Sequence, residues 1–161
     1  MKIVVASDHA GFGLKEKLLP YLEELGYEVE DKGAFEYNEE DDYPDFIVPA
    51  AREVSQHPNQ VKGIILGGSG QGEAMTANKF SAVRAAVYYG QGQHIVDDEE
   101  GEEGSIIKLS REHNNANILS LGARFITTEE MRRVVKEWLE TPFVQNEKHE
   151  RRLAKMDHIH E

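Results

Sequence analysis

The stretch KGIILGGSGQGEAM, residues 62–75, decides the fold because a strand-like pattern passes directly into a glycine-rich turn. Its first part, KGIILGG (62–68), is an apolar run of the length of a strand. Its second part brings four glycines close together, which lets backbone N–H groups approach an anion closely. In parallel α/β sheets, ligands bind beyond the carboxyl ends of the strands. The stretch therefore predicts both a buried strand and a binding loop at its end.

Strand-like runs recur on both sides of this stretch, with segments of helical period between most of them. The other runs are KIVVAS (2–7), YEVEDKG (27–33), VRAAVYY (83–89) and NILSLGA (117–123). Strands that alternate with helices indicate βαβ units and a doubly wound parallel sheet. We therefore predict an α/β fold of Rossmann-like type, a three-layer sandwich with a five-stranded parallel sheet.

Two of the intervening helices have clear sequence signals. Gly26 stands where the glycine that ends a helix belongs, whereas Pro20 predicts a kink or a restart within the same helix. Thr127 and Glu130 form a capping box ahead of a later helix. The apolar stripe of the first helix consists of Leu14, Leu18, Leu22 and Leu25.

The composition limits the class of protein. The 161 residues are 39% apolar and 30% charged, as is ordinary for one soluble globular domain. The net charge of −12 argues against nucleic acid or an anionic membrane surface as the main partner. Because there is no cysteine, disulfides, thiolate metal sites and cysteine nucleophiles are excluded. No segment approaches the roughly 18 apolar residues of a membrane span, and MKIVVAS is too short for a signal sequence, so we expect a cytoplasmic protein.

Two acidic segments interrupt the strand and helix pattern. FEYNEEDDYPD (35–45) and DDEEGEE (97–103) hold 12 of the 30 acidic residues, and we interpret both as loops with solvated charge. The pair Thr141-Pro142 predicts the end of the preceding helix, and this point divides the chain. We expect residues 1–141 to form the Rossmann-like domain and residues 142–161 a charged helical tail. The basic residues of this tail are Lys148, Arg151, Arg152 and Lys155.

Polar groups follow three of the predicted strands: SDHAG (7–11), GGSGQGE (67–73) and GAR (122–124). We expect them to meet at one site beyond the carboxyl edge of the sheet. The glycine loop does not have the spacing of a dinucleotide fingerprint, a P-loop or a nucleophile elbow. Ser69 is therefore interpreted as a hydrogen-bond donor and not as a nucleophile. The plain alternative is a strand-to-helix turn without chemistry.

Glu73 places a negative charge just inside this glycine loop. Its structural interpretation is a glutamate in the first helical turn whose negative charge interacts favourably with the helix dipole. Its functional interpretation is a base that removes a proton from the carbon next to a carbonyl. The loop N–H groups and Ser69 would then face the enediolate oxygens that develop. We predict this second role, because the loop would bind the charge that Glu73 creates.

Two of the seven histidines have polar neighbours that indicate a site. His9 follows Asp8 at a predicted strand end, and His113 precedes Asn114 at the end of a predicted helix. The alternative for both is a structural, hydrogen-bonded histidine. Asp8 with His9 could begin a metal site, but no second pair of ligands has a recognisable spacing, so we predict no metal.

Motifs of one protein family occur in order along almost the whole chain. They are SDHAGFGLKEKLLPYLEELGYEVEDKGAF, DDYPDF, GIILGGSGQGEAMTANK, RAA, REHNNANILSLGAR and HERRL. In this order they resemble the type B ribose-5-phosphate isomerases, a family that also contains the galactose-6-phosphate isomerase subunits. The resemblance implies a Rossmann-like α/β/α fold and a homodimer or dimer of dimers with active sites between two subunits. It also implies reversible aldose–ketose isomerisation of a sugar phosphate, without a metal or other cofactor.

The resemblance also implies roles for single positions. Asp8 and His9 would bind the sugar and assist ring opening, and Tyr43 would line the pocket. Many members have a cysteine base after the third strand, where this chain has Gly67. Glu73 instead resembles the base of a subgroup that uses a glutamate on the following helix. The loop that binds the enediolate would consist of Gly68, Ser69, Gly70, Gln71 and Gly72.

Other positions would complete the sugar and phosphate sites. By the same resemblance, His113 would be the acid of ring opening and Asn114 would bind a hydroxyl group of the sugar. Either residue would reach the active site of its own subunit or that of the other subunit in the dimer. The phosphate would be held by Arg124, Lys148 and Arg152. Members commonly have arginine in place of Lys148, and lysine keeps the charge but loses the bidentate fork.

Residues 91–104 are an extra stretch relative to this family and precede the helix of His113. We expect them near the mouth of the site or the dimer edge, where they would tune substrate size and supply no chemistry. The leading function is the conversion of ribose 5-phosphate to ribulose 5-phosphate through an enediolate. The alternatives are a hexose-6-phosphate isomerase of the same mechanism and a non-catalytic module that binds a sugar phosphate.

Overall fold

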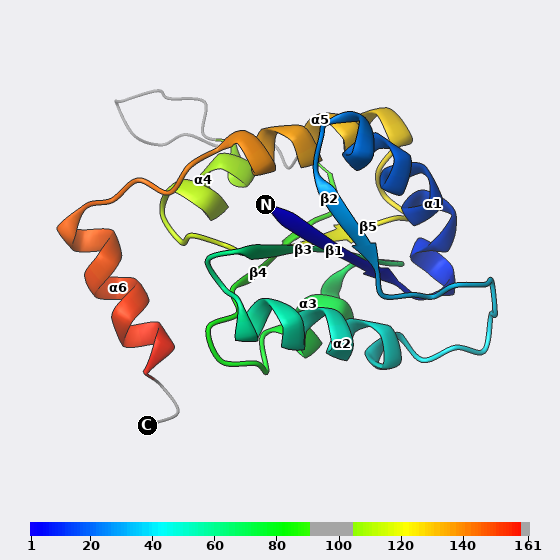
Figure 1. Ribbon diagram of the computed structural model, residues 1–161, viewed down its shortest axis with the longest axis horizontal. Helices are drawn as coiled ribbons and strands as arrows, with labels where there is room; N and C mark the ends of the chain where they lie inside the picture. Colours follow the sequence, from blue (N-terminus) through cyan, green and yellow to red (C-terminus); the bar gives the residue numbers. More distant parts are fainter. Residues whose placement is uncertain (91–104, 159–161) are drawn as a thin grey trace.

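Five parallel strands form the centre of the computed structural model, which describes residues 1–90 and 105–158 (Figure 1). In the sheet they lie in the order β2-β1-β3-β5-β4, and all neighbours are parallel. The three central strands are almost completely buried, as expected for a parallel sheet covered on both faces. The strands are β1 (Lys2–Ser7), β2 (Glu28–Asp31), β3 (Val61–Gly67), β4 (Ala85–Tyr88) and β5 (Ile118–Gly122).

Helices cover both faces of this sheet, which confirms the predicted three-layer fold (Figure 1). One apolar core joins α1, α4 and α5 to the face that carries Ile3 and Val5. The other joins α2 and α3 to the face that carries Val4 and Ala6, because successive strand residues point to opposite sides. The helices are α1 (His9–Glu24), α2 (Tyr43–Gln56), α3 (Gln71–Ala77), α4 (Ile106–Glu112), α5 (Thr128–Glu140) and α6 (Glu147–Asp157).

The helix ends follow the sequence signals, with two differences. Gly26 has φ +84° just after α1, as predicted, but the helix continues through Pro20 without a restart. Burial of Leu18 and Leu22 on either side of Pro20 holds this helix to the sheet despite the missing N–H. Thr127 accepts the Glu130 N–H as predicted, whereas the Glu130 carboxylate accepts the Tyr88 hydroxyl and does not close the capping box.

The C-terminal helix α6 lies apart from the layers of the sandwich (Figure 1). Its far end contacts the main body through an ion pair between Arg84 and Asp157, with Nη1 and Oδ1 3.1 Å apart. The extra stretch, residues 91–104, lies outside the described residues. Among residues 1–90 and 105–158, no helix is long and apolar enough to cross a membrane.

Candidate active site

A cavity of about 330 Å³ lies beyond the carboxyl ends of β1, β3 and β5. Because β3 lies between β1 and β5 in the sheet, the residues that follow these three strands come together. The cavity gathers most of the residues that the sequence indicates as functional. It is lined by Asp8, His9, Ala10, Tyr43, Gly68, Ser69, Gly72, Glu73, Arg124 and Phe125.

The Glu73 carboxylate lies directly over Gly67, the last residue of β3. A Cβ atom at position 67 would be only 1.7 Å from Glu73 Oε1, so a larger residue cannot coexist with this position of the carboxylate. The glutamate therefore fills the space that a side chain on residue 67 would occupy. Glu73 is 4% exposed, and burial raises the pKa of its carboxyl, with a further contribution from Asp8. A carboxyl group with a raised pKa at a cavity wall is suited to general base catalysis near neutral pH.

The glycine loop after β3 is held in place by backbone geometry. Gly70 has φ +76° and precedes the short helix α3, and its carbonyl accepts the Ser120 hydroxyl at 2.7 Å. The Ser69 Oγ accepts the Gln71 N–H at 3.3 Å, which leaves the hydroxyl hydrogen of Ser69 to donate into the cavity. Gly70 is buried and Gln71 exposed, and these two loop residues are outside the cavity lining.

Tyr43 and Arg124 form walls of the cavity on either side of the glycine loop. A Cβ atom on Gly72 would be 2.9 Å from the Tyr43 hydroxyl, so the absence of a side chain lets the phenol lie against the loop. A Cβ atom on Gly68 would be 3.3 Å from the Arg124 guanidinium carbon. The exposed guanidinium places one positive charge at the cavity, where it can pair with an anionic group such as a phosphate.

Asp8 and His9 begin α1 at the cavity. The Asp8 carboxylate caps the helix by accepting the Gly11 N–H at 3.0 Å. The His9 Nδ1 lies 2.7 Å from Asp41 Oδ1, and the His9 backbone N–H donates to the same oxygen at 3.1 Å. The bond to Asp41 is the main reason that the pKa of His9 is raised, with the charge of Asp8 adding to it.

Asp41 is a residue of this site for which the sequence predicts no role, although it begins the motif DDYPDF. It belongs to the acidic segment 35–45, which we interpreted as solvated, but its side chain is only 7% exposed. That interpretation is wrong for this residue, because the loop before α2 folds back onto the start of α1. Side-chain atoms of Asp8, His9 and Asp41 lie within 4.8 Å of one another, a spacing compatible with a metal ion. Two of these atoms already bond to each other, and the absence of a metal stays a prediction.

Four residues with expected site roles lie away from this cavity in their own chain. His113 ends α4, where its ring centroid is 4.4 Å from that of His149, and Asn114 lines a second cavity of about 380 Å³ beside α6. Lys148 and Arg152 are exposed on α6. This helix and the start of α1 lie at opposite ends of the view in Figure 1.

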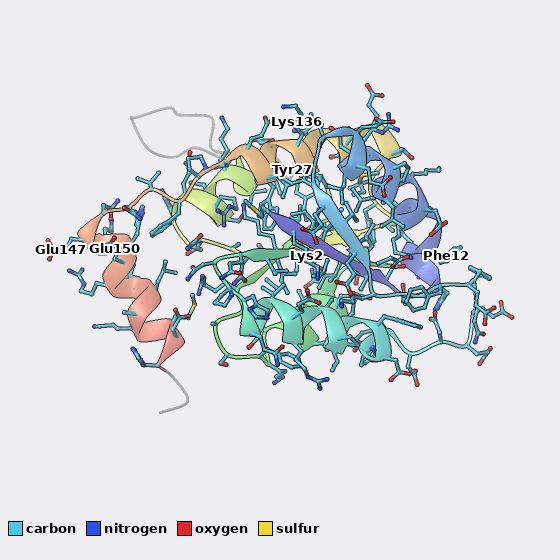
Figure 2. The ribbon with its side chains drawn as sticks, viewed as in Figure 1. Lys2, Phe12, Tyr27, Lys136, Glu147 and Glu150 are labelled. Atoms are coloured by element: carbon cyan, nitrogen blue, oxygen red, sulfur yellow. The ribbon has the colours of Figure 1, made fainter. Side chains whose placement is uncertain are left out.

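The same separation can be followed in the side chains. Figure 2 shows Glu147 and Glu150 on α6 at one end of the molecule and Phe12 on α1 at the other. The basic residues of α6 therefore cannot contact a ligand that His9 of the same chain contacts. If they bind the substrate at all, they do so in a second copy of the chain.

Comparison with known proteins extends along almost the whole chain. The family model described as Ribose/Galactose Isomerase matches residues 3–156. Ribose-5-phosphate isomerase B from Mycolicibacterium paratuberculosis is 36% identical over 164 residues, which cover 100% of this chain and 94% of the relative.

Solved structures agree with this comparison. Ribose-5-phosphate isomerase B from Mycoplasma genitalium with bound ribulose-5-phosphate superposes with a TM-score of 0.84 and 33% identity, covering 97% of this chain and 93% of that one. A ribose 5-phosphate isomerase from Thermotoga maritima has a TM-score of 0.81 and 39% identity, covering 98% of each chain. The likeness therefore includes both the sequence and the fold.

Proposed function

The chain belongs to the ribose/galactose isomerase family, and from this we propose that it interconverts ribose 5-phosphate and ribulose 5-phosphate. It is an aldose–ketose isomerase of the ribose-5-phosphate isomerase B type, and its substrate is a sugar phosphate. The observation that carries the mechanism is the buried Glu73 carboxylate in the space above Gly67. A base at this point borders the same cavity as the glycine loop and Arg124.

The reaction proceeds by proton transfer through an enediolate. Glu73 removes the proton from C2 of the open-chain aldose and returns it to C1, while the hydroxyl proton of O2 moves to O1, which gives the ketose. The Ser69 hydroxyl and the backbone N–H groups of Gly68 to Gly72 face the oxygens on which negative charge develops. Groups that bind this charge more strongly than the neutral carbonyl lower the barrier. Tyr43, Asp8 and His9 hold the hydroxyl groups of the sugar.

The phosphate site is completed by a second copy of the chain. Arg124 supplies one positive charge at the cavity, while Lys148 and Arg152 are exposed on α6, away from their own cavity. In a homodimer, or a dimer of dimers, this helix of one protomer would reach the cavity of the other. His113 and Asn114 would reach it from the same side, as the acid of ring opening and a hydroxyl ligand.

This division gives the two parts of the chain separate roles. Residues 1–141 form the isomerase domain, and residues 142–161 complete the phosphate site of the neighbouring protomer. Residues 91–104 tune which sugars enter. The enzyme acts in the cytoplasm and uses no metal or other cofactor.

The test of the activity is an assay of the purified protein on ribose 5-phosphate and on a panel of aldohexose 6-phosphates. We expect turnover of ribose 5-phosphate, with Glu73→Gln reducing kcat about 100- to 10,000-fold and changing KM little. Turnover of hexose 6-phosphates alone would assign a different substrate. Binding of the sugar phosphates without turnover would mean a non-catalytic module.

The shared site has its own test, in which two inactive variants are mixed. Glu73→Gln and His113→Ala remove groups that the proposal places in one cavity from different chains. After subunit exchange, heterodimers contain one intact site, and activity should return to a fraction of the wild-type value. If exchange is demonstrated by mass spectrometry and no activity returns, the sites are not shared.

A further inference from the structure

The contact between Asp41 and His9 is the most specific polar arrangement at the cavity that the proposed reaction leaves unexplained. One carboxylate oxygen, Asp41 Oδ1, accepts both the His9 backbone N–H at 3.1 Å and the ring Nδ1 at 2.7 Å. Since an ionised carboxylate can only accept hydrogen bonds, the ring must carry its hydrogen on Nδ1. The other ring nitrogen, Nε2, is thereby left without a hydrogen when the imidazole is neutral.

The remaining oxygen of this carboxylate makes no hydrogen bond within the part of the chain that the structure describes. Asp41 Oδ2 is buried and finds no hydrogen-bond partner among residues 1–90 and 105–158. A buried carboxylate oxygen without a partner costs stability, and an amide could make the same contacts to His9 without the charge. The charge of Asp41 is therefore better explained by its effect on His9 than by a contribution to folding.

We propose that Asp41 is a positioning residue that holds the ring of His9. The Nδ1–H of the ring faces the loop of Asp41, and Nε2 faces the substrate. His9 Nε2 then acts as the base of sugar ring opening. This inference rests on the proposed function and on the part in ring opening that the family resemblance implies for His9, and what it adds is the role of Asp41. The pairing of a carboxylate with a histidine orients the ring and stabilises the imidazolium that forms when Nε2 takes a proton.

Ring opening transfers two protons and breaks one carbon–oxygen bond. The hydroxyl proton on O1 of the cyclic sugar moves to His9 Nε2, and the C1–O1 bond becomes a carbonyl. The bond between C1 and the ring oxygen O4 breaks, and O4 takes a proton from an acid, which the proposed dimer supplies as His113 of a second copy. The imidazolium of His9 then loses its proton to solvent and the deprotonated His113 takes one up, which restores the starting state of both groups.

The charges that face His9 come from several elements. Asp41 in the loop before α2 and, to a smaller extent, Asp8 before α1 raise the pKa of the imidazole, whereas the partial burial of the ring and Arg124 after β5 lower it. The Tyr37 ring meets the imidazole edge-on at a centroid distance of 6.4 Å. Of these groups, only Asp41 makes a direct hydrogen bond to the ring, so its charge can be removed without disturbing the others.

The experiment compares wild-type protein with Asp41→Asn and a matched control, Glu40→Gln. Glu40 precedes Asp41 in the same loop and is exposed, so its substitution removes one charge without touching His9. Two reactions are followed for each protein. Conversion of ribose 5-phosphate requires ring opening, whereas exchange of solvent deuterium into ribulose 5-phosphate does not, because a ketopentose esterified at O5 cannot close a ring. NMR titration of the imidazole gives the pKa and the tautomer of His9.

We expect Asp41→Asn to lower kcat/KM for ribose 5-phosphate about tenfold or more, while deuterium exchange into ribulose 5-phosphate stays within about twofold of wild type. The pKa of His9 should fall, whereas the Nδ1–H tautomer should persist, because the amide oxygen of asparagine accepts the same hydrogen bond. The Tm should stay within about 2 °C of wild type, because the lost charge is not one that the fold needs. Glu40→Gln should match wild type in every measurement.

Three results would overturn the inference. An unchanged pKa of His9 in Asp41→Asn would show that the charge of the carboxylate does not act on the ring. An equal loss of ribose 5-phosphate conversion and deuterium exchange would mean that Asp41 supports the site in general. Full activity of Asp41→Asn on ribose 5-phosphate would remove it from the reaction. An inactive wild-type protein would instead refute the proposed function itself.

Discussion

Replacement of Gly67 by alanine is the most direct test of the geometry at the base. The new Cβ would be 1.7 Å from Glu73 Oε1 and 2.1 Å from Cδ, far closer than atoms can approach. Glu73 must therefore turn its carboxyl group away from this position. We expect kcat on ribose 5-phosphate to fall about 100- to 10,000-fold, the usual contribution of a general base.

The effect on stability should be much smaller than the effect on activity. The clash involves the end of a flexible side chain, so rotation of Glu73 relieves it, and we expect a cost of about 1 kcal/mol, the low end for overpacking. For a domain of this size that corresponds to a fall in Tm of about 2–4 °C. Thermal unfolding and initial rates on the same samples separate the two effects.

Two controls make this prediction refutable. Gly13→Ala adds the same methyl group to α1, where a Cβ meets no atom within 4 Å, and should leave kcat unchanged. Gly67→Ala combined with Glu73→Ala removes the clash, so Tm should recover relative to Gly67→Ala while activity does not. Wild-type kcat in Gly67→Ala would show that proton transfer does not depend on a carboxylate at this position.

Three further results are expected. Arg152→Ala should raise KM for ribose 5-phosphate by a factor equivalent to about 1.5–3 kcal/mol, measured from initial rates, and an equal KM would remove Arg152 from the phosphate site. Activity should persist after dialysis against EDTA, and a loss that zinc or magnesium restores would contradict a reaction without metal. Glu30 binds Lys2 and Lys32, and these hydrogen bonds lower the pKa of its carboxyl from 4.5. The contribution of Glu30 to stability is therefore fully present above pH 4.5, and it is lost as the pH falls through the lower pKa of the folded state. The difference in unfolding free energy between wild type and Glu30→Gln should therefore be constant near neutrality and disappear in acid, and a difference that grows in acid would contradict the assignment.

Much of the fold follows from local patterns. The five apolar runs became the five strands, and Gly26 ends α1 at positive φ, because strand period and glycine backbone freedom act within a few residues. Of the two outcomes predicted at Pro20, a kink or a restart, the restart does not occur, since the packing of the leucine stripe on the sheet lies outside the local pattern. The strand-end groups could be expected to converge because parallel strands bring their carboxyl ends to one edge.

The sequence by itself thus determined the parallel α/β sandwich, the glycine loop after β3 and the family of the chain, since these depend on residue type and spacing along the chain. Only the tertiary structure decided which side chains meet. It put the Glu73 carboxylate into the space over Gly67 and buried Asp41 against His9, although Asp41 stands in an acidic run that has the composition of a solvated loop. It also placed Lys148 and Arg152 away from their own cavity. The reason is physical: burial and distance between segments depend on how the layers pack, and residue spacing does not contain that information.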